Sequence, residues 1–111
     1  MFVTDLFEYT DDNTRRLVVV YPGRFQPFHQ GHAAVYHELE AKFGRGNVYI
    51  ATSNKSDDAK SPFNFADKIQ LMHAAGVPDN HILQVAQPYN PQEYQKLLGY
   101  NPANTVLVVA V

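Results

Sequence analysis

Residues 17–21, Leu-Val-Val-Val-Tyr, are the feature that most constrains the fold of this chain. The run is apolar without polar alternation, as expected of a strand that is covered on both faces, the usual condition in parallel sheets. Pro22 and Gly23 end it. Further apolar runs follow, and they predict three more strands over residues 48–52, 82–85 and 105–111.

Helical patterns separate these predicted strands. Val35, Leu39 and Phe43 recur at every fourth residue after the first strand. The pattern predicts a helix that begins at Gly31, ends at Gly44 and carries those three residues on its apolar face.

Two further helices are predicted between the later strands. Asn64 and Asp67 stand three residues apart, an arrangement typical of a helix start with a capping box. This second helix ends at Gly76, and residues 91–98 form a short third helix or turn.

The alternation of strands and helices predicts an α/β fold, a Rossmann-like three-layer sandwich with a parallel sheet and right-handed crossovers. We interpret residues 1–14 as a polar lead-in and residues 15–111 as one domain. In such sheets, ligands bind at the carboxyl ends of the strands. The loop that follows the first strand is therefore where chemistry is expected.

Composition and charge exclude several functional classes. The chain has no cysteine, which excludes disulfides, thiolate metal sites and a cysteine nucleophile. A formal net charge of −2 over 111 residues argues against nucleic acid or an anionic membrane as a partner, although a small anionic ligand stays open. No apolar run is long enough to span a bilayer. We therefore expect a cytoplasmic protein, in the host cytoplasm if a phage encodes it.

The loop over residues 23–32 combines groups that suit a polyphosphate. Gly23 lets the backbone turn sharply and approach a ligand closely. Arg24 is a multi-donor cation suited to phosphate oxygens. His29 and His32 flank Gly31 at a helix start, where free N–H groups and the helix dipole favour anions. These groups would also stabilise negative charge that develops during phosphoryl transfer.

Other interpretations of the two histidines stay open. His29 and His32 could be a metal pair, or they could merely cap or pack against the helix. Without cysteine or a second cluster of ligands nearby, the metal pair is disfavoured and no protein-bound metal site is expected.

The segment Gly-Arg-Phe-Gln-Pro-Phe-His-Gln-Gly-His, residues 23–32, resembles the signature of the HIGH-motif, cytidylyltransferase-like nucleotidyltransferases. The branch most similar is that of the archaeal-type nicotinamide mononucleotide adenylyltransferases and related phage or bacterial proteins. A second stretch, residues 61–68, is similar to the Asn-Pro-Phe segment that opens the second helix in that branch. The resemblance covers residues 17–72, and the remainder follows the family only in its strand order.

The resemblance implies a reaction and its participants. Members of this superfamily bind ATP or CTP with Mg²⁺, and a phosphorylated small molecule attacks the α-phosphorus while pyrophosphate leaves. On matching positions, His29, His32 and Arg24 would be catalytic. The two histidines would contact the triphosphate, and Arg24 would contact phosphate. The positions expected to line the nucleotide site with them are Gly23, Phe25 and Gly31.

Two more residues are candidates for phosphate or substrate contacts. Lys68 stands where relatives commonly carry an arginine. Asn54 follows the second predicted strand directly and is placed to face the cleft.

The sequence also departs from the family pattern. Relatives carry a later Ile-Ser-(Ser/Thr)-x-x-Arg-like motif, and this chain ends at Val111 before any such motif, so we expect the C-terminal part of the family fold to be missing. An open edge beside residues 105–111 would favour self-association, so a homo-oligomer is among the expected assemblies. The first candidate acceptor is nicotinamide mononucleotide. Cytidylyl transfer to a phospho-alcohol and a non-catalytic nucleotide-binding module of a larger phage protein are the alternatives.

Overall fold

The computed structural model describes residues 15–56 and 62–111. The lead-in predicted for residues 1–14 lies outside the described residues, as does Ser61 of the second family-like stretch. The strands are β1 (Arg16–Pro22), β2 (Val48–Thr52), β3 (Ile82–Gln84) and β4 (Thr105–Val109). All three pairings are parallel and the strand order is β3-β2-β1-β4, which confirms the predicted parallel sheet.

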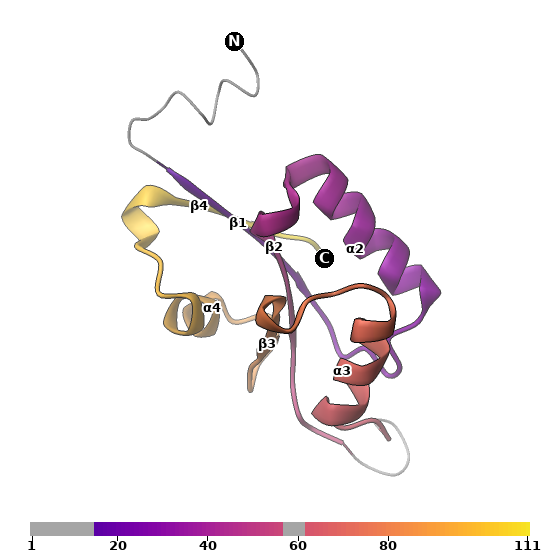
Figure 1. Ribbon diagram of the computed structural model, residues 1–111. Helices are drawn as coiled ribbons and strands as arrows, with labels where there is room; N and C mark the ends of the chain where they lie inside the picture. The colour runs from indigo at the N-terminus through magenta and orange to yellow at the C-terminus, as the bar shows by residue number, and fades with distance from the viewer. Residues whose placement is uncertain (1–14, 57–61) are drawn as a thin grey trace.

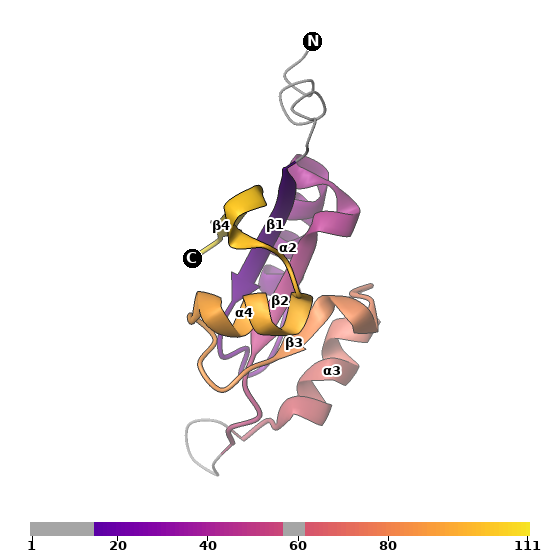
Figure 2. The ribbon, with the colours of Figure 1, turned by 90° about the vertical axis from the view of Figure 1, so that its left-hand side faces the viewer.

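Helices cover both faces of the sheet. They are α2 (Gln30–Phe43), α3 (Phe65–Ala74) and α4 (Pro91–Leu98). Figure 1 shows α2 and α3 on one side of the strands and α4 on the other. Figure 2, turned by 90°, shows α4 in front of the sheet. The predicted three-layer sandwich is therefore confirmed. A short 3₁₀ turn precedes each strand after β1, and these turns are Arg45–Asn47, Asp79–His81 and Pro102–Asn104.

Strand β1 lies at the centre of the sheet, between β2 and β4. Val18, Val19 and Val20 are completely buried, because their side chains alternate between two cores. Val19 packs with α2 and α3, while Val18 and Val20 pack with α4. Burial on both faces explains why the run lacks polar alternation.

The buried face of α2 differs from the predicted one. Val35 is 38% exposed, whereas Tyr36 is completely buried against the sheet. Ala33, Leu39 and Phe43 are partly buried in the same core as Tyr36. Steps of three and four residues follow the helical period of 3.6, whereas repeated steps of four drift around the helix, so the prediction for Val35 was wrong.

The start of α3 is as predicted. Asn64 Oδ1 accepts from the Asp67 backbone N–H at 2.9 Å, and Asp67 Oδ2 accepts from the Asn64 backbone N–H at 3.1 Å. This reciprocal capping box satisfies two N–H groups that would otherwise lack partners.

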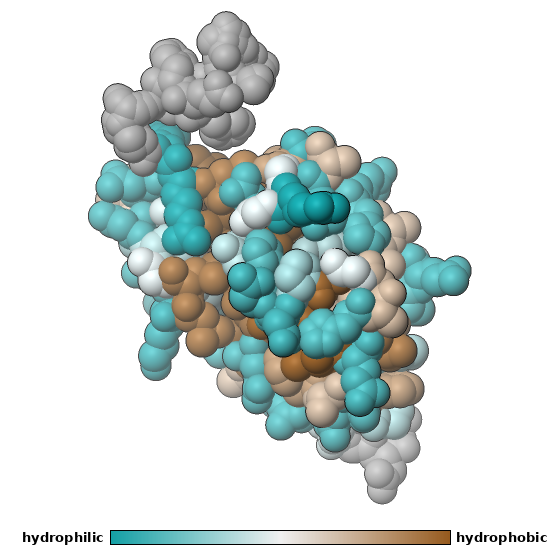
Figure 3. Space-filling view, viewed as in Figure 1, coloured by the Kyte–Doolittle hydropathy of each residue, from teal (hydrophilic) through white to brown (hydrophobic). Residues whose placement is uncertain are grey.

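The surface is mixed in polarity. On the face shown in Figure 3, hydrophobic patches are broken up by hydrophilic residues. Large exposed hydrophobic side chains include Val35 on α2, Leu71 on α3 and Leu97 on α4. Among the described residues, no helix is both long and apolar enough to cross a membrane.

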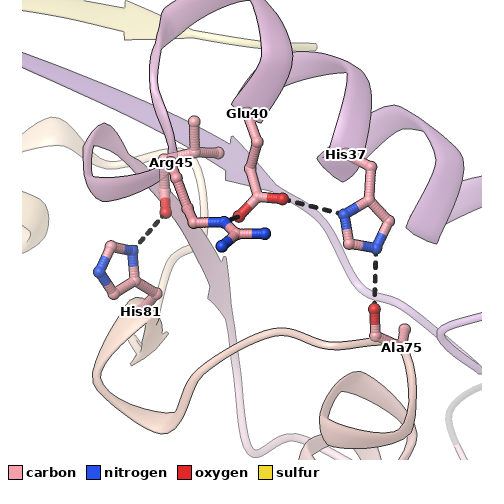
Figure 4. Close-up of polar contacts among 6 residues, drawn as sticks. His37, Glu40, Arg45, Ala75 and His81 are labelled. Carbon is pink, nitrogen blue, oxygen red and sulfur yellow. Dashed lines mark hydrogen bonds and ion pairs between the residues drawn. The ribbon is translucent and has the colours of Figure 1, made fainter.

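A histidine joins α2 to the end of α3. Figure 4 shows His37 between Glu40 and Ala75. The His37 Nδ1 lies 2.9 Å from Glu40 Oε1, and its Nε2 lies 2.8 Å from the Ala75 carbonyl oxygen. Both partners are acceptors, so the ring satisfies both contacts only when it is protonated. The hydrogen bonds to Glu40 and Ala75 raise the pKa of His37, against smaller opposing effects of burial and Arg45.

We predict that this contact stabilises the fold more at low pH. Because the pKa of His37 is raised in the folded state, its contribution is complete below the ordinary histidine value of about 6.5 and is lost as the pH rises through the raised value. The side chain is 49% exposed, so the contribution is below ~1 kcal/mol. Urea unfolding of the wild type and His37→Gln should differ at about pH 5 and converge at about pH 9. His37→Gln made in a Glu40→Gln background is the control. If the difference in unfolding free energy between the wild type and His37→Gln is the same at both pH values, the prediction is contradicted.

Candidate functional site

The loop after β1 folds onto an aromatic cluster. Phe25 has a backbone φ of 48°, in the left-handed region that is unusual for a residue with a side chain. The side chain of Phe25 is buried. Its ring packs edge-on against Tyr21, Phe28 and His32 at centroid distances of 5.2, 5.4 and 4.9 Å. The ring of Phe25 is therefore part of the core, and only its backbone is left to face a ligand. Gly23 continues the pairing with β2, since its N–H donates to the Ala51 carbonyl oxygen at 3.0 Å.

His29 and His32 cap α2 reciprocally. His29 Nδ1 accepts from the backbone N–H groups of Gly31 at 3.0 Å and His32 at 3.4 Å. His32 Nδ1 accepts from the His29 backbone N–H at 3.1 Å. The two rings stack with centroids 3.8 Å apart and an angle of 20° between their planes. The capping interpretation left open by the sequence is thus correct in geometry.

The cap determines the chemical state of both rings. An Nδ1 that accepts a hydrogen bond carries no proton, so each neutral ring bears its proton on Nε2. Burial, followed by the charge of His29, lowers the pKa of His32, which keeps that ring neutral at neutral pH. Neither Nε2 has a hydrogen-bond partner within the described part of the chain. The pair therefore presents two N–H donors at the positive end of a helix.

A cationic cleft of about 370 Å³ lies at the carboxyl ends of β1 and β2. Arg24, Lys55 and Lys68 contribute three positive charges, and no carboxylate stands among the described residues that line the cleft. Such a cleft attracts anions. The remaining lining residues are Gln26, Ser53, Ala86, Gln87, Pro88 and Tyr89.

Lys68 is the buried cation of this cleft. Its Nζ donates to Thr52 Oγ1 at 3.1 Å and to the Ser53 carbonyl oxygen at 2.8 Å, and the Thr52 hydroxyl donates to the Arg24 carbonyl oxygen at 3.3 Å. Burial, and then the charge of Arg24, lowers the pKa of Lys68. Its two partners among the described residues are neutral oxygens, and burying a charge beside neutral partners alone is costly. An anion in the cleft would relieve that cost.

The predicted site residues fall into separate groups. Arg24 and Lys68 line the cationic cleft together. His29 lines a different, largely apolar groove of about 480 Å³ between α2 and α3, with Phe28 and Leu71 among its walls. The structure therefore brings His29 to His32, and Arg24 to Lys68, without enclosing all four in one cavity.

Asn54 has a structural contact that sequence analysis did not foresee. Its Oδ1 accepts from the Phe65 backbone N–H at 2.9 Å and thereby ties the end of β2 to the start of α3. The residue also lines a neighbouring hollow of about 390 Å³ with Ser53 and Lys55. Asn54 is thus at the predicted edge of the sheet, with one side-chain oxygen already engaged.

Two cleft residues were missed by sequence analysis. Gln26 pairs with the main chain of Phe63, donating from Nε2 to its carbonyl oxygen at 2.7 Å and accepting its N–H on Oε1 at 2.8 Å. Tyr89 is 60% exposed at the cleft wall. No local signal predicts either role, because Gln26 and Phe63 are 37 residues apart and Tyr89 lies in a turn between β3 and α4.

The described residues hold no cluster of three or more histidine, aspartate or glutamate side chains that could bind a metal ion. Mg²⁺ prefers oxygen ligands, carboxylates above all, and the described cleft lining offers amides, hydroxyls and cations instead. This lining does not fit a resident Mg²⁺ held by the protein alone.

Gly31 provides a test of the histidine cap. A Cβ at this position would lie 2.9 Å from Cε1 of His29, so Gly31→Ala should displace the His29 ring. The gain in helix propensity and the loss of the cap are each about 1 kcal/mol, so the net change in stability should be small. Nitrogen chemical shifts of the imidazoles should show that His29 loses its preference for the Nε2–H tautomer. Gly46→Ala is the control because a Cβ there meets nothing within 4 Å, and an unchanged His29 tautomer in Gly31→Ala would contradict the prediction.

Several known proteins are similar to part of this chain. The chain is 36% identical over 53 residues to a nicotinamide-nucleotide adenylyltransferase of Sulfurisphaera tokodaii, covering 48% of this chain and 31% of that protein. It is 35% identical over 60 residues to the enzyme of that name from Halobacterium salinarum, covering 54% and 34%. A third such relative, from Methanocorpusculum labreanum, is 34% identical over 56 residues, covering 50% and 33%. Each match thus spans about a third of the length of the curated relative.

No solved structure matches the chain significantly. The profile of the cytidylyltransferase-like family matches residues 20–110. This range includes all of the predicted site residues and all of the strands, apart from the first residues of β1. Because this match covers most of the chain, the chain belongs to the cytidylyltransferase-like family, and its parallel sheet and the histidine pair at the first strand–helix corner are in keeping with that assignment.

Proposed function

We propose that this protein transfers a nucleoside monophosphate from ATP, or from CTP, to a phosphorylated small molecule and releases pyrophosphate. The observation that carries the proposal is the reciprocal cap of His29 and His32, which holds two Nε2–H donors at the start of α2. Packing alone does not require two histidines here, since asparagine or serine would cap the helix as well.

The start of α2 is the proposed triphosphate site. Helix N-termini bind phosphate through free N–H groups and the positive end of the helix dipole. The Nε2–H groups of His29 and His32 would add hydrogen bonds to the phosphate oxygens. The backbone of Gly23 and Phe25 would line the nucleotide side, and Gly31 leaves room for the His29 ring over the first turn.

The cationic cleft is the proposed site of the acceptor. Arg24 follows the carboxyl end of β1 and lines this cleft together with Lys68, so it would contact the phosphate of the acceptor and, as the loop leads on to α2, that of the triphosphate. The phosphate of the acceptor would supply the counterion that Lys68 lacks among the described residues of the lining. Asn54 and Lys55 are placed at the rim, in the adjoining hollow.

The reaction balances without a covalent enzyme intermediate. An oxygen of the acceptor phosphate forms a bond to the α-phosphorus of the triphosphate, and the bond from that phosphorus to the bridging oxygen of the β-phosphate breaks. Pyrophosphate leaves with the electron pair and the negative charge. The chain's contribution is to orient the two substrates and to stabilise that charge with His29, His32 and Arg24.

Mg²⁺ enters the proposal as part of the triphosphate substrate. Nucleoside triphosphates carry Mg²⁺ on their phosphate oxygens, and this ion keeps several waters and needs few protein ligands. When bound, it would neutralise charge on the phosphates. No step is assigned to a Mg²⁺ site of the protein, because the described lining does not supply one.

Nicotinamide mononucleotide is the first candidate acceptor. It is supported by the names of the relatives, all of which are nicotinamide-nucleotide adenylyltransferases. Cytidylyl transfer to a phospho-alcohol is the second candidate, since the family as a whole is described as cytidylyltransferase-like. Binding of a nucleotide without turnover would instead favour a non-catalytic module of a larger protein.

Calorimetric titration of the chain with Mg²⁺–ATP and Mg²⁺–CTP tests the triphosphate site. His29→Asn and His32→Asn keep an acceptor where Nδ1 stood, so each should preserve the helix cap and remove only the Nε2–H donor. We expect each to weaken binding of the preferred triphosphate about tenfold or more, the effect of one charge-assisted hydrogen bond. His73→Asn is the control, because His73 is exposed on α3 and pairs with Asp79. Wild-type affinity in both variants would contradict the proposal.

Lys68→Met tests the acceptor site separately. The substitution removes the buried charge and keeps most of the volume, so stability should change by no more than ~1 kcal/mol in either direction. Binding of nicotinamide mononucleotide should weaken about tenfold or more, because the counterion of its phosphate is lost. Thermal denaturation and titration measure the two effects. Unchanged affinity in a folded Lys68→Met variant would exclude Lys68 from the acceptor site.

A further inference from the structure

One carboxylate holds a wall of the cationic cleft. Glu93 Oε1 accepts from the Ala86 backbone N–H at 2.8 Å, and its Oε2 accepts from the Gln87 backbone N–H at 2.9 Å. Glu93 lies in the first turn of α4, whereas Ala86 and Gln87 line the cleft. The carboxylate therefore bridges α4 and the loop over residues 86–90, which we term the cleft-wall loop.

The contact begins where the sheet ends. The Val85 N–H donates to the Thr52 carbonyl oxygen at 2.9 Å, which is the last bond from this segment to β2. The next two N–H groups, of Ala86 and Gln87, have no strand to pair with and are satisfied by Glu93. An ionised carboxylate that accepts two N–H groups makes stronger bonds than a neutral acceptor does.

The rest of the cleft-wall loop is held by the same helix. The Tyr94 hydroxyl donates to the Pro88 carbonyl oxygen, and burial, with smaller effects of Tyr89, Tyr100 and Glu93, raises the pKa of Tyr94 to about 12, so the hydroxyl keeps its proton. The Asn90 N–H donates to the Gln87 carbonyl oxygen at 3.0 Å and closes a turn. Tyr89 lies within this turn, is 60% exposed and lines the cleft with Arg24 and Lys68.

We infer that Glu93 is a positioning residue for the acceptor. Its bidentate contact fixes the cleft-wall loop so that Tyr89 presents a flat ring next to the cations of the cleft. An aromatic ring beside cations suits a ligand that combines a planar ring with a phosphate. The inference rests on the proposed function and deepens it, because it concerns only the acceptor half of the site.

Glu93→Gln distinguishes positioning from simple electrostatics. Removing a negative charge near the cleft would, by charge alone, tighten the binding of any anion. Loss of positioning acts in the opposite direction, because glutamine has an NH2 donor in place of one of the two carboxylate oxygens that accept these N–H groups. Glu38→Gln makes the same change of charge on the exposed side of α2, remote from the cleft lining, and is the matched control.

The experiment compares three probes on each folded variant: nicotinamide mononucleotide, inorganic phosphate and the preferred Mg²⁺–triphosphate. In Glu93→Gln we expect about tenfold weaker binding of the mononucleotide, with less than about twofold change for phosphate and for the triphosphate. Hydrogen exchange at the amides of Ala86 and Gln87 should be faster in the same variant. Glu38→Gln should match the wild type in all of these measurements.

The outcomes separate this inference from the proposed function. If wild-type protein binds neither the triphosphate nor the mononucleotide, the proposed function fails and this inference fails with it. If the wild type binds both and Glu93→Gln binds the mononucleotide equally well or more tightly, only the role of Glu93 is overturned. Faster amide exchange with unchanged affinity would likewise overturn it, because Glu93 would then be merely structural.

Discussion

The start of α2 depends on His29 and His32, each of which accepts a hydrogen bond from the backbone N–H of the other. Through this contact, the turn after β1 and the first turn of the helix become a single unit. The buried ring of Phe25 packs against this unit, since it contacts the His32 ring edge-on. A local capping interaction thus accounts for the tautomer of both rings, and the tautomer determines which nitrogen can meet a ligand. Structure and proposed chemistry here rest on the same hydrogen bonds.

The second requirement of the site is a positive charge held inside the protein. Lys68 reaches the cleft from α3, which places its ammonium under the ends of β1 and β2. Its two acceptors among the residues that the structure describes are neutral, and they position the ammonium without neutralising it. A charge kept in this way is costly to the folded protein and favourable to an anionic ligand, so the same arrangement that reduces stability would increase affinity. The lowered pKa of Lys68 expresses that cost.

The walls of the cleft are joined by side chains that pair with main chain. Gln26 binds both main-chain groups of Phe63, Asn54 accepts the N–H of Phe65, and Glu93 accepts the N–H groups of Ala86 and Gln87. All of these contacts lie just past the carboxyl ends of strands, where backbone groups leave the sheet and need new partners. The polar residues at this edge therefore shape the site before any of them contacts a substrate.

The sequence by itself determined the fold class, because short stretches of the chain are enough to predict buried strands and helix caps. The uniform valine run of β1, the capping box of Asn64 and the loop of residues 23–32 each signal their structure within a few residues. Tertiary structure alone decided that Tyr36 and not Val35 faces the sheet, that Lys68 is buried, and that His29 and Arg24 line different hollows. It also decided the pairing of Gln26 with Phe63 across 37 residues. These features depend on which distant surfaces meet when the sheet assembles, and no local period or spacing encodes that meeting.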